Sequence, residues 1–320
     1  MKALVTGASG FIGSHLAQEL VRRSYEVRAL VRATSNLRWL EGAGLTLVAG
    51  DLQDQSSLLK AVAGSDVVFH LGAVIHASRW EKHRAVNVEG TENLLAACLK
   101  AAPRLQRFVF VSSISASGPS FKDRPKTEEA PCRPISAYGR SKLEAEEIVR
   151  RYGAEFPVVI LRPPNVLGAR EKEVQAVLRA LRKRLKPLLG TRDKQTSFIM
   201  VEDLVEAILL CAEKKEAAGR TYHVTDGQAH SWREPLDILS RLLGRRCLPL
   251  PYGLLYVLAG SAEIAFKLLG QRPPVRRSAL RSIHDHYWIF DSSKIERELG
   301  FHPRLTLEEG LRRIVAQASS

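Results

Sequence analysis

Two short groups of residues have the types and spacing needed for chemistry. In the first, Tyr138 and Lys142 are four positions apart. On a helix, this spacing puts both side chains on one face, about 6 Å apart. A free tyrosine titrates near ~10. A neighbouring ammonium stabilises the phenolate and lowers that pKa, which makes a tyrosine usable as a general acid/base. We therefore predict that Tyr138 transfers a proton and that Lys142 assists it.

The second group is a glycine-rich turn, in which Gly7, Gly10 and Gly13 recur at every third residue. An apolar run at 2–6 precedes the turn, and apolar residues at helical spacing follow it from 11 to 21. Strand, turn and helix bring backbone N–H groups and the positive end of a helix dipole to one point, which suits a pyrophosphate. Gly7 permits the turn, Gly10 lets phosphates approach the backbone, and Gly13 lets the helix pack on the strand.

A serine that could hold a substrate oxygen comes after the apolar run 108–111. Ser113 lies at the end of this expected strand, on the side of the sheet where substrate should bind. Ser112 and Ser115 are alternatives, and the sequence does not exclude Ser112. The glycine turn, the serine and the Tyr138–Lys142 pair, in this order, are typical of a nicotinamide-dependent enzyme.

Strand and helix patterns alternate along the chain and would position these residues. The expected strands are 27–31, 45–49, 67–70, 107–111 and 158–161, and the expected helices are 16–22, 56–62, 92–100 and 141–151. This order predicts an α/β fold of the Rossmann type, a doubly wound parallel sheet with helices on both faces. We expect an NAD(P)-binding domain over 1–163, with a return segment near 198–226. A smaller, mainly substrate-binding portion would occupy 164–320.

Composition favours a soluble globular enzyme: 320 residues, 45% hydrophobic and 26% charged. The first expected strand leaves no room for a signal peptide, and no apolar run reaches spanning length, so we expect a cytoplasmic protein. The net charge of +14 comes with basic clusters at 179–186 and 271–281, but we see no nucleic-acid-binding module. The cysteines have no metal-binding spacing, and we expect reduced thiols and no metal site at Cys98, Cys132, Cys211 and Cys247.

Several segments together resemble the extended short-chain dehydrogenases/reductases, the superfamily that includes sugar-nucleotide epimerases, dihydroflavonol reductases and 3β-hydroxysteroid dehydrogenases. The glycine turn matches the TGxxGxxG of these enzymes, and Tyr138 to Lys142 matches their YxxxK. The likeness covers nearly the whole chain. Its other segments are Gly50-Asp51-Leu52, His70-Leu71-Gly72-Ala73, Asn87-Val88-Glu89-Gly90-Thr91, Val111-Ser112-Ser113, Arg162 to Gly168, Tyr222 to Asp226 and Phe290 to Lys294.

The resemblance implies roles for these positions. Ser113, Tyr138 and Lys142 would be the catalytic set, with Tyr138 and Lys142 also at the cofactor and Lys142 on the nicotinamide ribose. The sheet order would be 3-2-1-4-5-6. The remaining implied cofactor contacts, besides the three glycines, are Ser9, Phe11, Ile12, Asp51, Leu52, Leu71, Gly72, Ala73, Asn87, Pro163 and Val166.

The end of the second expected strand bears on the choice of cofactor. NAD-preferring enzymes usually have an acid there, to bond the ribose 2′-hydroxyl. This chain has Arg32 and no acid. An arginine can clamp a 2′-phosphate with two hydrogen bonds, so we favour NADP over NAD. The other interpretation of Arg32 is a solvated side chain near the adenine.

The two residues after Ser113 narrow the choice of reaction. A sugar-nucleotide dehydratase would have an Asp-Glu pair after a threonine at this place, whereas the chain has Ile114 and Ser115. We therefore expect interconversion of a secondary alcohol and a ketone. The loop 115–136 would help to close the site. His76, Arg79 and Trp80 are candidates for substrate contact, or ordinary loop residues.

A long uncharged stretch favours a lipophilic, sterol- or isoprenoid-like substrate. No charge occurs from Leu248 to Ala262, and the apolar character continues to Leu269. The stretch is either a buried packing helix, or the wall of an apolar pocket or a peripheral membrane contact. On a helix, one face would carry Leu255, Leu258, Ala262, Ala265, Phe266 and Leu269. The substrate would be a small molecule, and a homodimer is a further expectation by analogy.

Two rival functions stay open. A nucleotide-sugar epimerase would use the same catalytic residues with tightly bound NAD, and Asn165 favours it, since its family counterpart often touches the nucleotide sugar. A dinucleotide-sensing regulator would bind the cofactor without chemistry. The intact set of Ser113, Tyr138 and Lys142 argues against the regulator, because a binding module needs no acid/base.

Overall fold

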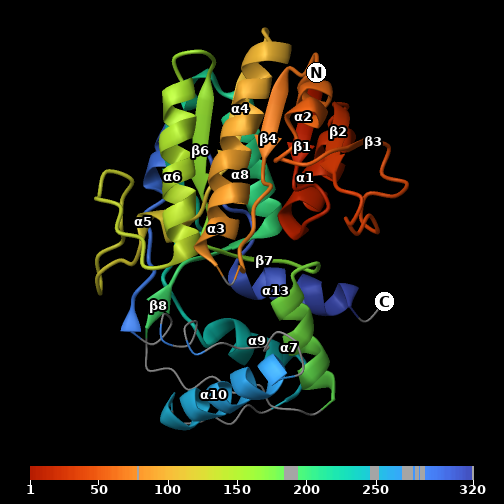
Figure 1. Ribbon diagram of the computed structural model, residues 1–320. Coiled ribbons are helices and arrows are strands. Elements are labelled where there is room, and N and C mark those ends of the chain that lie inside the picture. The colour runs from red at the N-terminus through yellow and green to blue at the C-terminus, as the bar shows by residue number, and fades with distance from the viewer. Residues whose placement is uncertain are drawn as a thin grey trace.

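The computed structural model describes residues 1–77, 79–183, 194–245, 252–268, 277, 281 and 285–318. At its centre is a parallel sheet of seven strands in the order β10-β6-β5-β4-β1-β2-β3 (Figure 1). The strands are β1 (Lys2–Thr6), β2 (Glu26–Val31), β3 (Thr46–Ala49), β4 (Val67–His70), β5 (Arg107–Val111), β6 (Val158–Arg162) and β10 (Thr221–His223).

The doubly wound α/β fold and the strand order 3-2-1-4-5-6 are therefore confirmed, and β10 extends the order by pairing with β6. The central strands are buried on both faces, as their unbroken apolar runs predict. All five expected strands are present within a residue or two of their predicted bounds.

Helices cover both faces of the sheet. One face packs against α1 (Phe11–Arg22) and α8 (Val201–Glu213), and the other against α2 (Gln55–Val62), α4 (Gly90–Ala101) and α6 (Ala137–Tyr152). The short helices α3 (Trp80–His83) and α5 (Ile114–Ser117) come after β4 and β5 at the carboxyl edge of the sheet, and α12 (Ser293–Leu299) contacts β10. The π-helix η1 (Arg84–Glu89) leads directly into α4, and the 3₁₀ turn η2 (Lys215–Ala217) precedes β10.

A smaller group of elements lies beyond the carboxyl edge of the sheet (Figure 1). Its apolar core joins α7, β9, α9 and α13. The elements are β7 (Asn165–Leu167), α7 (Lys172–Arg182), β8 (Gln195–Thr196), β9 (Phe198–Met200), β11 (His230–Ser231), α9 (Glu234–Leu242), α10 (Tyr252–Leu268) and α13 (Leu307–Gln317). The division at residue 163 stays a prediction.

Some expectations fall on residues that the structure does not describe. These residues are Cys247, the ends of the uncharged stretch (248–251 and 269), and the greater part of the basic clusters (184–186, 271–276 and 278–280). In the described part, Cys98, Cys132 and Cys211 are free thiols. No helix there combines the length and apolar character needed to cross a bilayer.

Candidate active site

Tyr138 lies in the first turn of α6, which Ser136 begins by accepting a hydrogen bond from the Gly139 amide (3.0 Å). Gly139 lets this turn approach α5, because a Cβ there would lie 2.2 Å from the Ser115 carbonyl oxygen. The approach brings the Tyr138 phenol within reach of the Ser113 hydroxyl, whose hydrogen bonding acts to lower the pKa of Tyr138. Two of the predicted catalytic residues are thus in contact.

The neighbouring serines are distinguished by their partners. The Ser112 hydroxyl is buried and donates to Glu146 (2.6 Å), away from Tyr138. The Ser113 oxygen caps α5 by accepting from the Ser115 amide (3.1 Å) and also meets the tyrosine. This geometry favours Ser113 over Ser112 as the residue beside a substrate oxygen.

Lys142 is almost fully buried one turn further along α6. Its ammonium donates to the Val111 carbonyl oxygen (2.8 Å) and lies 4.0 Å from the centre of the Phe110 ring. Burial lowers the pKa of Lys142 to about 7, although the charge of Glu146 opposes the shift.

The acidity of the tyrosine differs from the prediction. Burial raises the pKa of Tyr138 to about 12, and the hydrogen bond with Ser113 counters only part of the shift. The predicted lowering by Lys142 is wrong for this arrangement, because the ammonium is directed to the strand carbonyl of Val111 rather than to the phenol.

A buried ionic network behind Lys142 was not predicted from the sequence. Glu146 accepts two hydrogen bonds from the buried Arg162 (2.6 and 2.9 Å), one from Ser112 and one from Arg150 (2.7 Å). Arg162 also donates to the Ser117 hydroxyl (3.0 Å). A signal for this network was present: Glu146 comes one helical turn after Lys142, on the same apolar-flanked face of α6.

The glycine turn fits a pyrophosphate. Gly7 has φ +71°, and a Cβ there would lie 2.8 Å from the Gly72 nitrogen. A Cβ on Gly13 would lie 2.2 Å from the Gly7 carbonyl oxygen, so close packing forbids a side chain. Gly10 is exposed, and it begins α1 with no side-chain cap. The amides of the first helical turn are therefore left for an anion at an open surface.

The other predicted cofactor residues are placed around this turn. Ser9, Phe11 and Ile12 belong to it, and Val166 lies in β7. The rest come directly after strand ends at the carboxyl edge of the sheet: Arg32 after β2, Asp51 and Leu52 after β3, Leu71, Gly72 and Ala73 after β4, and Pro163 after β6. Their contact with a cofactor stays a prediction.

Asn87 holds two sides of the site together from the π-helix. Its side chain bonds the Val74 amide (2.7 Å) and carbonyl (2.9 Å), and it donates to the Ser141 hydroxyl (2.9 Å). His83, which was not predicted, is 3% exposed and lies between the Val74 carbonyl (Nδ1 to O, 3.1 Å) and the ring of Tyr138 (centroids 6.3 Å apart). No sequence signal marks His83, because only the fold brings α3 to α6.

Apolar side chains adjoin the catalytic residues. Ile114, next to Ser113, packs with Trp288 and Phe290, and Trp232 lies against them. A separate cavity of about 350 Å³ is lined by Trp80, Pro134, Ile135, Ser136, Ala137 and Arg140. Ala137 directly precedes Tyr138 in α6. Trp80, a predicted substrate contact, stacks under the Arg140 guanidinium at 4.5 Å.

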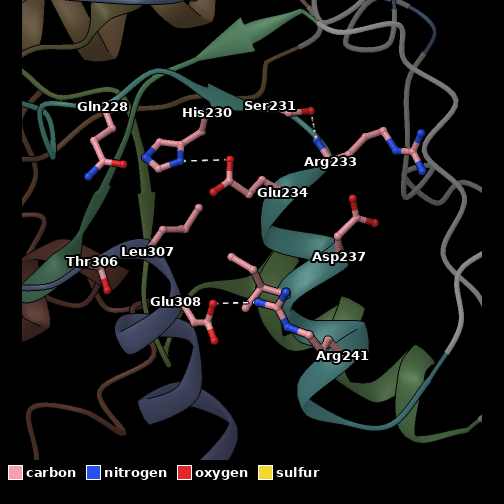
Figure 2. A pocket seen from close by; sticks show the side chains of 11 residues that line it. Gln228, His230, Ser231, Arg233, Glu234, Asp237, Arg241, Thr306, Leu307 and Glu308 are labelled. Atoms are coloured by element: carbon pink, nitrogen blue, oxygen red, sulfur yellow. Dashed lines mark hydrogen bonds and ion pairs between the residues drawn. The ribbon is translucent and has the colours of Figure 1, made fainter.

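A larger cavity of about 700 Å³ lies elsewhere, between β11, α9 and the start of α13 (Figure 2). His230 and Arg241 line it, and each is paired with a carboxylate, Glu234 (3.1 Å) and Glu308 (2.7 Å) respectively. None of its lining residues belongs to the predicted site. Size alone therefore does not locate the chemistry in this molecule.

Comparisons with known proteins identify the family. A model of the NAD dependent epimerase/dehydratase family matches residues 3–225. The chain is 33% identical over 322 residues to the 4-hydroxy-2-methyl-3-oxo-4-farnesyl-3,4-dihydroquinoline-1-oxide ketoreductase of Stigmatella aurantiaca, covering 97% of this chain and 95% of that protein. It is 28% identical over 331 residues to a 3-beta-hydroxysteroid dehydrogenase of Mycolicibacterium neoaurum, and the match covers 97% of this chain and 89% of that protein.

A solved structure has the same fold over nearly the whole chain. The structure of MoeE5 in complex with UDP-glucuronic acid and NAD has a TM-score of 0.78 and 27% identity, covering 99% of this chain and all of that one (100%). The chain belongs to the NAD-dependent epimerase/dehydratase family and is an NAD(P)-dependent oxidoreductase of the extended short-chain type.

Proposed function

We propose that this enzyme interconverts a secondary alcohol and a ketone on a lipophilic, sterol- or isoprenoid-like molecule. The observation that carries the proposal is the contact of Ser113 with Tyr138 above the buried Lys142, at the carboxyl edge of the sheet. The adjoining side chains of Ile114 and Trp288 are apolar.

Each residue of the set has a distinct task. The nicotinamide, when bound, supplies or accepts a hydride at the carbon that carries the substrate oxygen. Ser113 holds that oxygen by a hydrogen bond, and Tyr138 gives it a proton in the reducing direction. A pKa of about 12 suits Tyr138 to the protonated, donating form. Lys142, with a pKa of about 7, would hold the nicotinamide ribose.

The cofactor would lie along the glycine turn, with its pyrophosphate on the amides that come after Gly10. Asp51, Leu71 and Asn87, with their predicted neighbours, would line the adenine and ribose portions. We favour NADP, because the exposed Arg32 stands where an acid would repel a 2′-phosphate. NAD is the alternative.

The lipophilic substrate is supported by the apolar cluster of Ile114, Trp288 and Phe290 next to Ser113. It is also supported by the names of two relatives, one named for a farnesyl-bearing quinoline and one for a hydroxysteroid. Residues 164–320 would supply most of the substrate contacts, and 1–163 most of those to the cofactor. We expect a cytoplasmic enzyme, with a homodimer as a further expectation.

A nucleotide-sugar epimerase is the second candidate. It is supported by the likeness to MoeE5, which was solved with UDP-glucuronic acid and NAD. Asn165 donates to the Thr196 hydroxyl at 3.3 Å and could instead meet a polar substrate. A regulator without activity is the least favoured function, because a protein that only binds the dinucleotide has no need of Tyr138 as an acid/base with Ser113 beside it.

One experiment separates these functions. The purified protein is denatured, any released nucleotide is identified by mass spectrometry, and the native protein is then offered NADPH or NADH with a panel of lipophilic ketones. The proposal predicts an exchangeable cofactor and consumption of NADPH that depends on a ketone. Stoichiometric NAD⁺ together with turnover of a UDP-sugar would favour the epimerase and contradict the proposal.

A further inference from the structure

Large apolar side chains point to solvent along one helix. On α10 (Tyr252–Leu268), Leu254, Val257, Leu258 and Ile264 are 47%, 63%, 48% and 61% exposed. The helix lies at the end of the molecule farthest from β1, beyond α9 (Figure 1). Single exposed leucines are common on protein surfaces, whereas four large apolar residues on one helix are not.

The spacing of these residues places them on one continuous face. Positions 254, 257, 258, 261, 264 and 265 have the i, i+3, i+4 pattern of a helix, and all are exposed. The polar member, Ser261, satisfies its hydroxyl within the helix by donating to the Val257 carbonyl (3.2 Å). The helix turns its small residues Ala259 and Gly260 inward, which reverses the usual amphipathic arrangement.

This orientation corrects one of the interpretations made from the sequence. In a buried packing helix the predicted apolar face would point inward, but two of its members, Leu258 and Ala265, are exposed, and Ala262 and Phe266 are only half-buried. The side chains of Leu255, Lys267 and Leu268 lie outside the described part of the chain.

The sequence that contains this face has charges of one dominant sign. Residues 245–281 contain seven lysines and arginines and one acid, Glu263. Glu263 is paired with Arg277 (3.0 Å), and the guanidinium groups of Arg277 and Arg281 lie 5.6 and 6.0 Å from the ring of Tyr256. The Arg277 and Arg281 guanidinium groups therefore lie on the flank of α10 that carries Tyr256, Gly260 and Glu263, next to the exposed apolar face.

We propose that the outward face of α10 binds to an anionic lipid surface, with its aliphatic side chains in the interface and the neighbouring arginines on the headgroups. A second copy of the chain is a poorer occupant, because a symmetric contact would place two strongly basic segments together, in a protein of net charge +14. The inference does not rest on the proposed reaction, but a lipid-bound enzyme would meet lipophilic substrates where they concentrate.

The test uses the full-length protein and vesicle co-sedimentation. Vesicles of phosphatidylcholine alone are compared with a phosphatidylcholine–phosphatidylglycerol mixture, at low and high salt. We expect binding to the anionic vesicles that weakens with salt. The double variant Val257→Asp/Ile264→Asp should lose about ten-fold or more of this binding. Leu99→Asp, at a leucine 46% exposed on α4, is the matched control and should bind as the wild type does.

The outcomes decide the proposal independently of the reaction. Circular dichroism and cofactor binding show that each variant is folded. Equal binding by wild type and the double variant, or no binding to anionic vesicles, overturns the proposal. A dimer in analytical ultracentrifugation that the double variant abolishes, without lipid binding, would assign the face to a second copy instead.

Discussion

Replacing Glu146 with glutamine removes a buried negative charge from the centre of the network behind Lys142. The Glu146 side chain is 0% exposed and that of Arg162 is 3% exposed, with their nearest atoms 2.6 Å apart. Glutamine can keep one acceptor, but it leaves the charge of Arg162 buried with only neutral partners, among them Ser117.

The expected cost depends on this burial. Removing one partner of a buried ion pair costs about 3–5 kcal/mol, because the other charge stays uncompensated. Since Ser117 still binds Arg162, we expect the lower end, about 3 kcal/mol. For a chain of 320 residues, this corresponds to a fall in Tm of roughly 4–5 °C.

Arg150, which binds the same Glu146 carboxylate, provides a control. Arg150 also bonds Glu146, at 2.7 Å, but its side chain is 43% exposed. Arg150→Met should therefore cost less than about 1 kcal/mol. Thermal unfolding of wild type, Glu146→Gln and Arg150→Met at neutral pH measures both effects. Equal Tm values for the two variants would refute the reasoning, because burial would then not distinguish the two pairs.

The effect of Glu146→Gln should depend on pH. Burial acts to raise the pKa of Glu146, but the hydrogen bonds and charge of Arg162 outweigh it and hold that pKa below 4.5. A depressed carboxyl pKa contributes stability that is present above the ordinary value and is lost as the pH falls through the lower folded value. The gap in Tm between wild type and Glu146→Gln should therefore narrow below about pH 4.5 and be widest at neutral pH. A gap independent of pH would contradict an ionic origin.

Three further predictions concern the cofactor side. Gly13→Ala should lower stability by about 1–3 kcal/mol, because its Cβ would lie 2.2 Å from a backbone oxygen. Gly10→Ala, whose Cβ would lie 3.1 Å from the Gly7 carbonyl oxygen, should lower the Tm less and bind dinucleotide more weakly. The reverse order of Tm values would contradict the packing argument. Arg32→Ala should lower the affinity for NADPH roughly ten-fold and the affinity for NADH little, because a charge-assisted hydrogen bond is lost. Equal losses of affinity in titrations with the two dinucleotides would rule out a 2′-phosphate contact. Because burial lowers the pKa of Lys142 to about 7, dinucleotide affinity should fall as the pH rises through neutrality. Glu146→Gln removes a charge that raises this pKa, so the midpoint of the fall should move to lower pH. An unmoved midpoint in fluorescence titrations would show that the charge of Glu146 does not affect Lys142.

The parts of the fold that were predictable from sequence are those with local signals. Short apolar runs mark the positions of the central strands, and the steric needs of Gly7 and Gly13 mark the glycine turn. Tyr138 and Lys142 stand out because their helical spacing occurs together with the glycine turn and the serine after the strand. These features depend on residues within one or two turns of each other.

The parts that were not predictable depend on distant segments. His83 meets Tyr138 only because α3 folds against α6. The pKa of Tyr138 depends on where the Lys142 ammonium is directed, which the Val111 carbonyl decides. The orientation of α10 was also hidden, because an apolar run looks the same in sequence whether its leucines face a core or solvent.

The central claim is that Tyr138 transfers the proton to the substrate oxygen, and steady-state turnover of Tyr138→Phe tests it most directly. With a ketone that the wild type reduces, the variant should lose about 10²–10⁴-fold in kcat, while its dissociation constant for NADPH changes little. Thermal unfolding controls for the fold. Turnover within a few-fold of wild type, with the cofactor still bound, would contradict this role for Tyr138.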